Sequence, residues 1–183
     1  MTEKAEQKLL ERICNRDGKA MKALYDEYAG LLTAVCSRYV DADEDVKDIM
    51  QESFIRIFSS IGSFQHRGRG SLRAWMTKIV VNTALKHLRD SAKMGFLSFA
   101  DSLPDVEDEG EMSLEGIPPE VVQEMIRSLP VGYRTVFNLF VFEGKSHREI
   151  AQVLGIKENS ASSQLHRAKS MLEQKVREYR KNH

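Results

Sequence analysis

This chain of 183 residues has little of what marks a secreted, membrane or disulfide-linked protein. No apolar run approaches the roughly 20 residues that a transmembrane helix needs, and the first residues are charged where a signal peptide would be apolar. The two cysteines, Cys14 and Cys36, have no metal-ligand spacing and form no disulfide framework. We therefore expect a protein of the reducing cytoplasm that does not insert into a membrane.

Sequence signals of catalysis and of cofactor binding are also absent. The five histidines show no metal-ligand spacing, and the sequence contains no Gly-rich phosphate loop and no nucleophile elbow. A nuclease in the N-terminal half would need carboxylates near the basic segment described below, yet residues 53–89 contain no acid. We expect no enzyme, no metal, no cofactor and no small-molecule substrate.

The net charge of zero conceals a strong segregation of charge along the chain. Residues 1–52 carry 8 Lys and Arg against 12 Asp and Glu, and residues 53–100 carry 8 against 1. Residues 101–143 carry 2 against 10, and residues 144–183 carry 9 against 4. Two basic segments separated by an acidic one indicate two anion-binding modules joined by a tether.

Apolar periodicity predicts helices along almost the whole chain, and hence an all-α protein. The predicted helices cover residues 5–16, 19–39, 43–61, 72–90, 120–129, 133–142, 147–154 and 158–180. Residues 91–118 are polar, acidic and interrupted by Pro and Gly, which is typical of a flexible linker. The expected organisation is two small helical domains, 1–92 and 119–183, joined by an acidic linker over 93–118.

The C-terminal domain has the pattern of a helix-turn-helix. Ser146 and Glu149 form a capping box before an apolar-periodic run, and Gly155 can end that first helix in the left-handed conformation. A second helix would bury a stripe of small and apolar residues, Ala161, Leu165, Ala168 and Leu172. It would then present outward Asn159, Ser160, Ser163, His166, Arg167 and Ser170. A polar, partly basic face of this kind is typical of a helix that enters the DNA major groove, and a plain helical hairpin is the alternative.

The predicted helix over 43–61 has one apolar face for the core and an unusual opposite face. That opposite face holds Asp48, Gln51, Glu52 and Ile55. An exposed isoleucine among acidic and polar residues indicates a protein-docking surface. A single surface apolar residue without function is the alternative.

Between this helix and the next lies a Gly-rich loop over 62–70, which carries Phe64, His66, Arg67 and Arg69. Ser71 is predicted to cap the following helix. On that helix Lys78, Asn82, Lys86 and Arg89 form a basic stripe beside the apolar face. Aromatic side chains above a basic stripe suit single-stranded nucleic acid, because bases stack or flip out while the backbone contacts the cations. A solvated basic helix is the alternative.

These segments together resemble the extracytoplasmic-function (ECF) sigma factors of bacterial RNA polymerase. DVKDIMQESFIRIF is similar to the helix of that family that docks on the polymerase. FQHRGRGSLRAWMTKIVVNTALKHLR resembles its melting and minus-ten segment, and LPVGYRTVFNLFVFEGKSHREIAQVLGIKENSASSQLHRAKSML resembles its minus-thirty-five domain. The resemblance covers nearly the whole chain.

The resemblance implies sigma regions 2 and 4, and it implies binding to core RNA polymerase, promoter DNA and an anti-sigma factor. Polymerase docking is then expected of Asp48, Gln51, Glu52 and Ile55. Minus-ten DNA is expected to contact Phe64, Gln65, His66, Arg67, Arg69, Arg73, Lys78, Asn82, Lys86 and Arg89. Minus-thirty-five DNA is expected to contact Lys157, Asn159, Ser160, Ser162, Ser163, His166, Arg167 and Lys169. The sequence departs from the family at Ser162 and Gln164, where Lys or Arg is frequent, which predicts weaker attraction of phosphates there.

The alternative function is a dimeric helix-turn-helix regulator whose N-terminal half senses a ligand. Such a regulator would bind palindromic duplex DNA on its own as a homodimer. It would leave the basic loop and the exposed Ile55 without a role.

Overall fold

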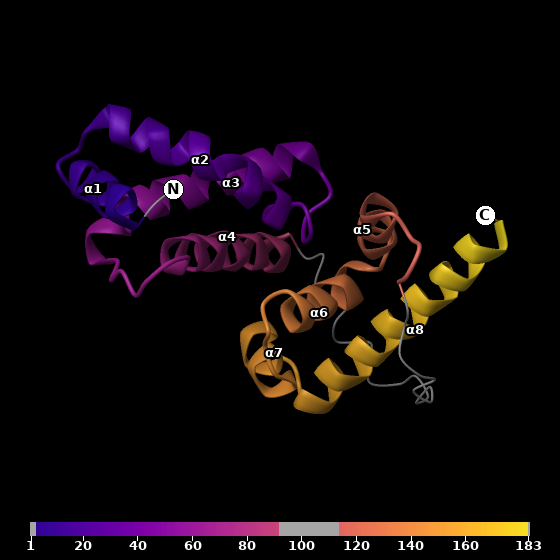
Figure 1. Ribbon diagram of the computed structural model, residues 1–183. Helices are drawn as coiled ribbons and strands as arrows, with labels where there is room; N and C mark the ends of the chain where they lie inside the picture. The colour runs from indigo at the N-terminus through magenta and orange to yellow at the C-terminus, as the bar shows by residue number, and fades with distance from the viewer. Residues whose placement is uncertain (1–2, 92–113, 183) are drawn as a thin grey trace. The chain divides into compact units, whose positions relative to one another are not determined.

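The computed structural model describes residues 3–91 and 114–182, and within these ranges the chain is helical and contains no strand (Figure 1). Contacts divide the chain into two compact units, Met1–Leu88 and Arg89–His183. The predicted all-α class is confirmed. Most of the predicted linker lies outside the described residues, so the linker and the domain boundaries stay predictions.

The first unit is a bundle of four α-helices. They are α1 (Glu3–Cys14), α2 (Gly18–Cys36), α3 (Asp43–Ser60) and α4 (Ser71–Asp90), with the short 3-10 helix η1 (Ile61–Ser63) after α3. Helix α2 packs against both α1 and α3. The core of this unit includes large side chains with no measurable exposure, among them Leu24, Leu32, Ile57, Leu72, Met76 and Val80. Helix α4 contributes Leu72, Met76 and Val80, so its apolar side is committed to the core and its polar side is available to a partner.

The turn between α1 and α2 is held by the side chain of Asp17. Its carboxylate accepts hydrogen bonds from the backbone N–H groups of Lys19 and Ala20, which caps α2, and another from Arg12 Nε at 2.8 Å. The Arg12 guanidinium and the backbone donor of Ala20 lower the pKa of Asp17. The turn fixes the angle between the two helices and so places α1 relative to the rest of the bundle.

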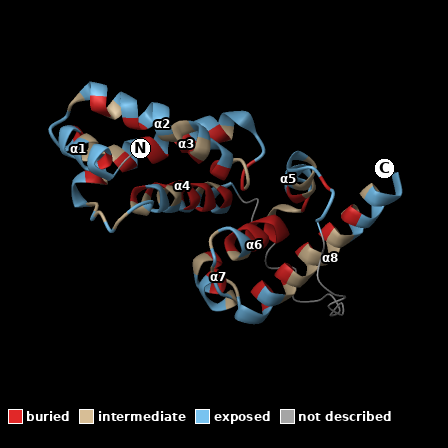
Figure 2. Cartoon of the chain, viewed as in Figure 1, coloured by how far each residue is buried: buried red, intermediate tan, exposed pale blue. Residues whose placement is uncertain are grey.

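The second unit is organised around a buried central helix. It comprises α5 (Pro119–Arg127), α6 (Val131–Val141), α7 (His147–Leu154) and α8 (Glu158–Asn182). Every residue of α6 from Gly132 to Leu139 is buried, and Figure 2 shows this helix red along most of its length. Helix α8 packs against both α6 and α7. Arg134 is 1% exposed, and its Nη1 donates to the carbonyl oxygen of Arg127 at 2.5 Å, which satisfies the last turn of α5.

The predicted helix-turn-helix is confirmed in α7 and α8. Ser146 Oγ accepts from the backbone N–H of Glu149, and the Glu149 carboxylate accepts from the backbone N–H of Ser146, so the capping box is complete. Gly155 ends α7 in the left-handed conformation, with φ of 69°. The predicted apolar stripe of α8 is buried at all four positions, Ala161, Leu165, Ala168 and Leu172.

Two local predictions were wrong. The second predicted helix was expected to reach residue 39, but α2 ends at Cys36, and Tyr39 and Val40 fold back into the core through backbone hydrogen bonds to Cys36. Ser71 does not cap α4, because it is the first helical residue and its hydroxyl donates to the carbonyl oxygen of Gly68 at 2.7 Å. Among the residues that the structure describes, no helix is both long and apolar enough to cross a membrane.

Candidate functional site

One exposed face of α3 carries the residues predicted to dock on a protein. Asp48, Gln51, Glu52 and Ile55 are all exposed, and their spacing of three and four residues places them on one side of the helix. Ile55 is 62% exposed, and its two neighbours in the sequence, Phe54 and Arg56, differ from each other in burial. Phe54 is buried in the core, whereas Arg56 forms an ion pair with Glu52 at 2.5 Å. The face therefore has an apolar centre and an acidic rim.

Tyr25 on α2 is a second exposed apolar residue of this unit, and the sequence analysis missed it. Its side chain is 49% exposed, and its ring centroid lies 4.7 Å from that of Phe54. The apolar pattern of α2 does not distinguish Tyr25 from the residues that this helix buries. Its exposure depends on how α2 packs against α3, which the neighbouring sequence does not show.

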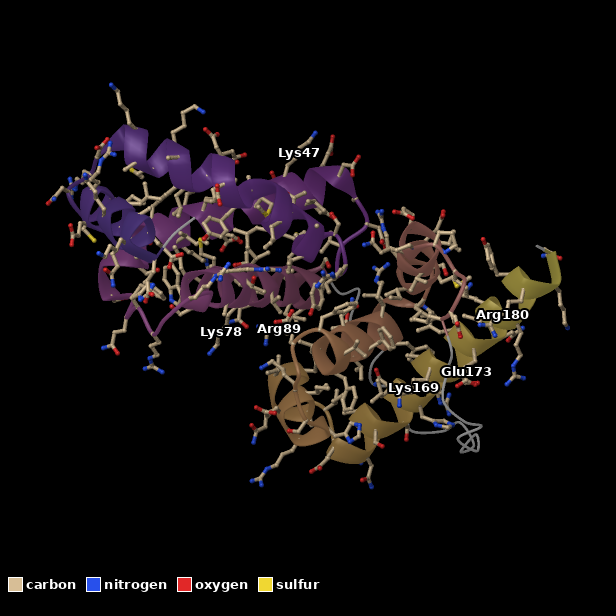
Figure 3. The ribbon with its side chains drawn as sticks, viewed as in Figure 1. Lys47, Lys78, Arg89, Lys169, Glu173 and Arg180 are labelled. Atoms are coloured by element: carbon tan, nitrogen blue, oxygen red, sulfur yellow. The ribbon has the colours of Figure 1, made fainter. Side chains whose placement is uncertain are left out.

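The predicted basic stripe on α4 is present. Lys78, Asn82, Lys86 and Arg89 are all exposed, and Figure 3 shows Lys78 and Arg89 projecting from the outer side of α4, while Lys47 projects from the opposite edge of the unit. The stripe extends about 16 Å along the helix axis at 1.5 Å per residue. Arg73, near the start of the same helix, is exposed too. The exposed Lys and Arg side chains of this helix form a positively charged surface.

The loop of residues 64–70 precedes α4 and, with the start of that helix, lines an open hollow. Gly68 and Gly70 have φ values of 98° and 85°, which side chains other than glycine rarely adopt. The hollow has a volume of about 450 Å³ and is lined by Ser63, Phe64, Gln65, Arg67, Ser71 and Trp75. The rings of Phe64 and Trp75 lie 5.1 Å apart, so the hollow combines aromatic surface with polar side chains at its edge.

The side chains of this loop alternate between solvent and the bundle. Gln65, Arg67 and Arg69 are exposed, as a contact with DNA would require. Phe64 is half-buried, and the side chain of His66 is only 14% exposed because it turns toward α1. There His66 Nε2 lies 3.1 Å from Oε1 of Glu6. The ring of His66 lies against Glu6, a residue far away in the sequence, and its expected contact with DNA stays a prediction.

Among the predicted DNA contacts of α8, the exposed ones lie at the start of the helix. Lys157, just before the helix, and Asn159 and Ser162 are exposed, whereas Ser163, His166, Arg167 and Lys169 are half-buried. Ser160 was predicted to face outward, but it is buried, with 7% exposure. Gln164 has no measurable exposure, so it is a core residue and its comparison with surface cations of the family was wrong. Both lie beside the apolar stripe, and they are covered because α6 and α7 pack on α8 together.

Helix α7 and the turn before it add cations that the sequence analysis did not include. Arg148 is exposed in the first turn of α7, and Lys145 precedes the capping box. The first helix of a helix-turn-helix crosses the DNA backbone, where such side chains contact phosphates. Nearby, the ring of His147 stacks on the ring of Phe140, with 5.4 Å between the centroids. Lys169 Nζ lies 6.0 Å from the centroid of the Phe140 ring. These contacts pack the start of α7 against α6 and α8.

No metal centre is found among residues 3–91 and 114–182, where no three His, Cys, Asp or Glu side chains are grouped to hold an ion. The chemistry that these surfaces offer is binding: an apolar and acidic protein face, a basic surface with an aromatic hollow, and a helix-turn-helix.

Comparison with known proteins decides the family. The family model for sigma-70 region 2 matches residues 24–94, and the model for sigma-70 region 4 matches residues 120–172. The ECF RNA polymerase sigma-E factor of Haemophilus influenzae is 30% identical over 182 residues, which is 93% of this chain and 95% of that protein. The chain belongs to the ECF sigma factors.

Further relatives agree. RNA polymerase sigma-H factor of Pseudomonas aeruginosa is 27% identical, and the alignment covers 94% of each protein. Among solved structures, the sigma factor RpoE of Bartonella quintana, crystallised with the anti-sigma factor NepR, superposes with a TM-score of 0.50 at 17% identity. That alignment covers 87% of this chain and 98% of the other, and it supports the fold. As an ECF sigma factor, the chain binds core RNA polymerase and directs it to promoters.

Proposed function

We propose that this sigma factor docks on core RNA polymerase through the exposed face of α3. The apolar centre at Ile55 supplies area that is buried on binding, and the surrounding Asp48, Gln51 and Glu52 supply polar contacts and orientation. Tyr25 extends the apolar part of the same unit. An acidic rim fits a polymerase surface of positive charge.

The basic surface of the first unit then captures the melted minus-ten element. The backbone of the unpaired strand follows the cations of α4, and one base leaves the stack and enters the hollow beside Phe64 and Trp75. Gln65 and Arg67 line the hollow, which supports a contact between them and the polar edge of such a base. Arg69 and Arg73 contribute charge near the entrance.

The second unit reads duplex DNA at the minus-thirty-five element. The first turns of α8 enter the major groove, with Asn159 and Ser162 toward base edges and Lys157 toward phosphate. Arg148 on α7 contacts the flanking backbone. Ser160 has no contact with DNA in this arrangement because it is buried.

We also propose an anti-sigma factor as a regulatory partner, since the Bartonella relative was crystallised with one. The exposed Val141 and Phe142 at the end of α6, 49% and 44% exposed, offer an apolar contact for a protein. The sigma factor acts with the polymerase in the cytoplasm, and the phosphodiester chemistry belongs to the polymerase.

The observation that carries this proposal is the presence of two different nucleic-acid surfaces in one chain, a basic face with an aromatic hollow and a helix-turn-helix. The test is run-off transcription on genomic fragments with purified chain and core polymerase. Promoter-specific transcripts that need both components are expected. A stable homodimer that binds palindromic duplex without polymerase would instead support the regulator.

A further inference from the structure

Glu6 is a buried carboxylate that none of the surfaces above uses. It lies on α1 and is 7% exposed, and its charge acts on the Tyr28 hydroxyl of α2. Burial first, and then the charge of Glu6, raises the pKa of Tyr28. A carboxylate held inside a domain whose partner is DNA needs a structural reason, because burying a charge is costly unless it is hydrogen-bonded.

The reason lies in the loop of residues 64–70. The backbone N of Gly68 lies 3.4 Å from His66 Nδ1, and His66 Nε2 lies 3.1 Å from Glu6 Oε1, which is hydrogen-bond distance. Glu3 lies on the outer side of the ring, 3.6 Å from Nδ1. The imidazole thus connects α1 to the backbone of the loop at the point where Gly68 adopts a left-handed conformation.

His66 stands between the two loop residues on the edge of the hollow. Gln65 and Arg67 are exposed, whereas the ring of His66 between them is turned toward the bundle. Gln65 and Arg67 share the backbone of His66 on either side, so holding the ring of His66 restricts the directions in which Gln65 and Arg67 point.

We propose that Glu6 is a positioning residue for promoter melting: by holding His66, it keeps Gln65 and Arg67 at the hollow in the arrangement that accepts an unpaired base. The proposal rests on the function proposed above for the hollow. It assigns to α1 a part in reading the minus-ten element without contact with the DNA.

The sign of the effect separates this role from simple electrostatics. A carboxylate close to a DNA surface repels phosphates, so its removal alone would strengthen binding. A positioning role gives the opposite result, since a free loop must be ordered when the base binds, and that ordering reduces affinity.

The experiment uses holoenzyme assembled from the full chain and core polymerase. The probe is a fluorescent single-stranded oligonucleotide carrying the non-template minus-ten region of a promoter that this holoenzyme transcribes. Glu6→Ala is expected to weaken probe binding about tenfold, the usual size of a hydrogen bond to a charged group, with polymerase affinity unchanged. Glu6→Gln keeps an acceptor for His66 Nε2 and is expected to restore most of the affinity.

Two controls isolate the loop. Glu11→Ala removes an exposed acid from the same helix, and Tyr28→Phe removes the hydroxyl whose pKa is raised by the charge of Glu6, without touching the loop. Both are expected to stay within about twofold of the unmodified holoenzyme. If Glu6→Ala does not fold, His66→Ala removes the same contact from the other partner. The double variant of Glu6 and His66 should bind the probe no more weakly than the single variant with the lower affinity.

Unchanged or tighter probe binding by Glu6→Ala overturns the proposal, as does an equal loss with Tyr28→Phe, which would mean that Glu6 only packs α1 on α2. Failure of the function proposed for the hollow gives a different pattern. In that case Arg67→Ala leaves probe binding unchanged, whatever the Glu6 variants do, and the positioning role falls with it.

Discussion

Ile55→Ala tests the docking face with a magnitude that follows from the structure. Full burial of an isoleucine side chain is worth about 1.5–3 kcal/mol. Because 62% of Ile55 is exposed in the free chain, burying the rest of it on docking should contribute about 1–2 kcal/mol of binding free energy. The variant should therefore raise the Kd for core RNA polymerase about 5–30-fold.

The free chain should keep its stability, because alanine is a better helix former than isoleucine and little buried area is lost. Thermal unfolding checks this, and competition for core polymerase against a labelled sigma factor gives the Kd. Thr33→Ala, which shortens an exposed β-branched residue on α2, is the matched control. A change of less than about twofold for Ile55→Ala, or an equal change for Thr33→Ala, would refute the reasoning.

Three further predictions concern the second unit and the cysteines. Arg167→Ala should weaken holoenzyme binding to minus-thirty-five duplex and reduce the slope of log K against log salt by about 0.9; an unchanged slope would remove Arg167 from the phosphate contacts. Hydrogen bonds from Ser146 lower the pKa of Glu149, so its capping contribution is present at neutral pH and is lost as pH falls through that lowered value. The difference in Tm between the unmodified chain and Glu149→Ala should accordingly shrink in acid, and a constant difference would contradict this. Cys14 is exposed, whereas burial raises the pKa of Cys36 to about 12, so a thiol reagent at neutral pH should label Cys14 in the native chain and Cys36 only after unfolding.

Features that depend on neighbours in the sequence could be predicted. The capping box at Ser146 and Glu149, the left-handed Gly155 and the buried stripe of α8 all follow from local rules, and all are confirmed. The exposed face of α3 was also predicted, because a helix with a complete apolar stripe places Ile55 opposite that stripe. Apolar periodicity is sufficient to predict which residues are exposed where a helix packs on the core through a single face.

Features that depend on distant parts of the chain could not be predicted. Ser160 and Gln164 lie at the flank of the α8 stripe, and the sequence does not show that α6 and α7 cover this flank together. His66 was expected to contact DNA because its loop is aromatic and basic and lies above the basic stripe, whereas the residue that lies against its ring, Glu6, is 60 residues away. A polar residue on a helix flank or a loop can face either way, and tertiary packing decides.

The central claim is that this chain opens promoter DNA only as part of a polymerase holoenzyme. The most direct measurement is the fluorescence of 2-aminopurine placed in the minus-ten element of a duplex promoter, which rises when the base unstacks. Core polymerase with the chain should give this rise, and neither component alone should do so. A rise with the chain alone, or none with both components on a promoter that they transcribe, would contradict the account.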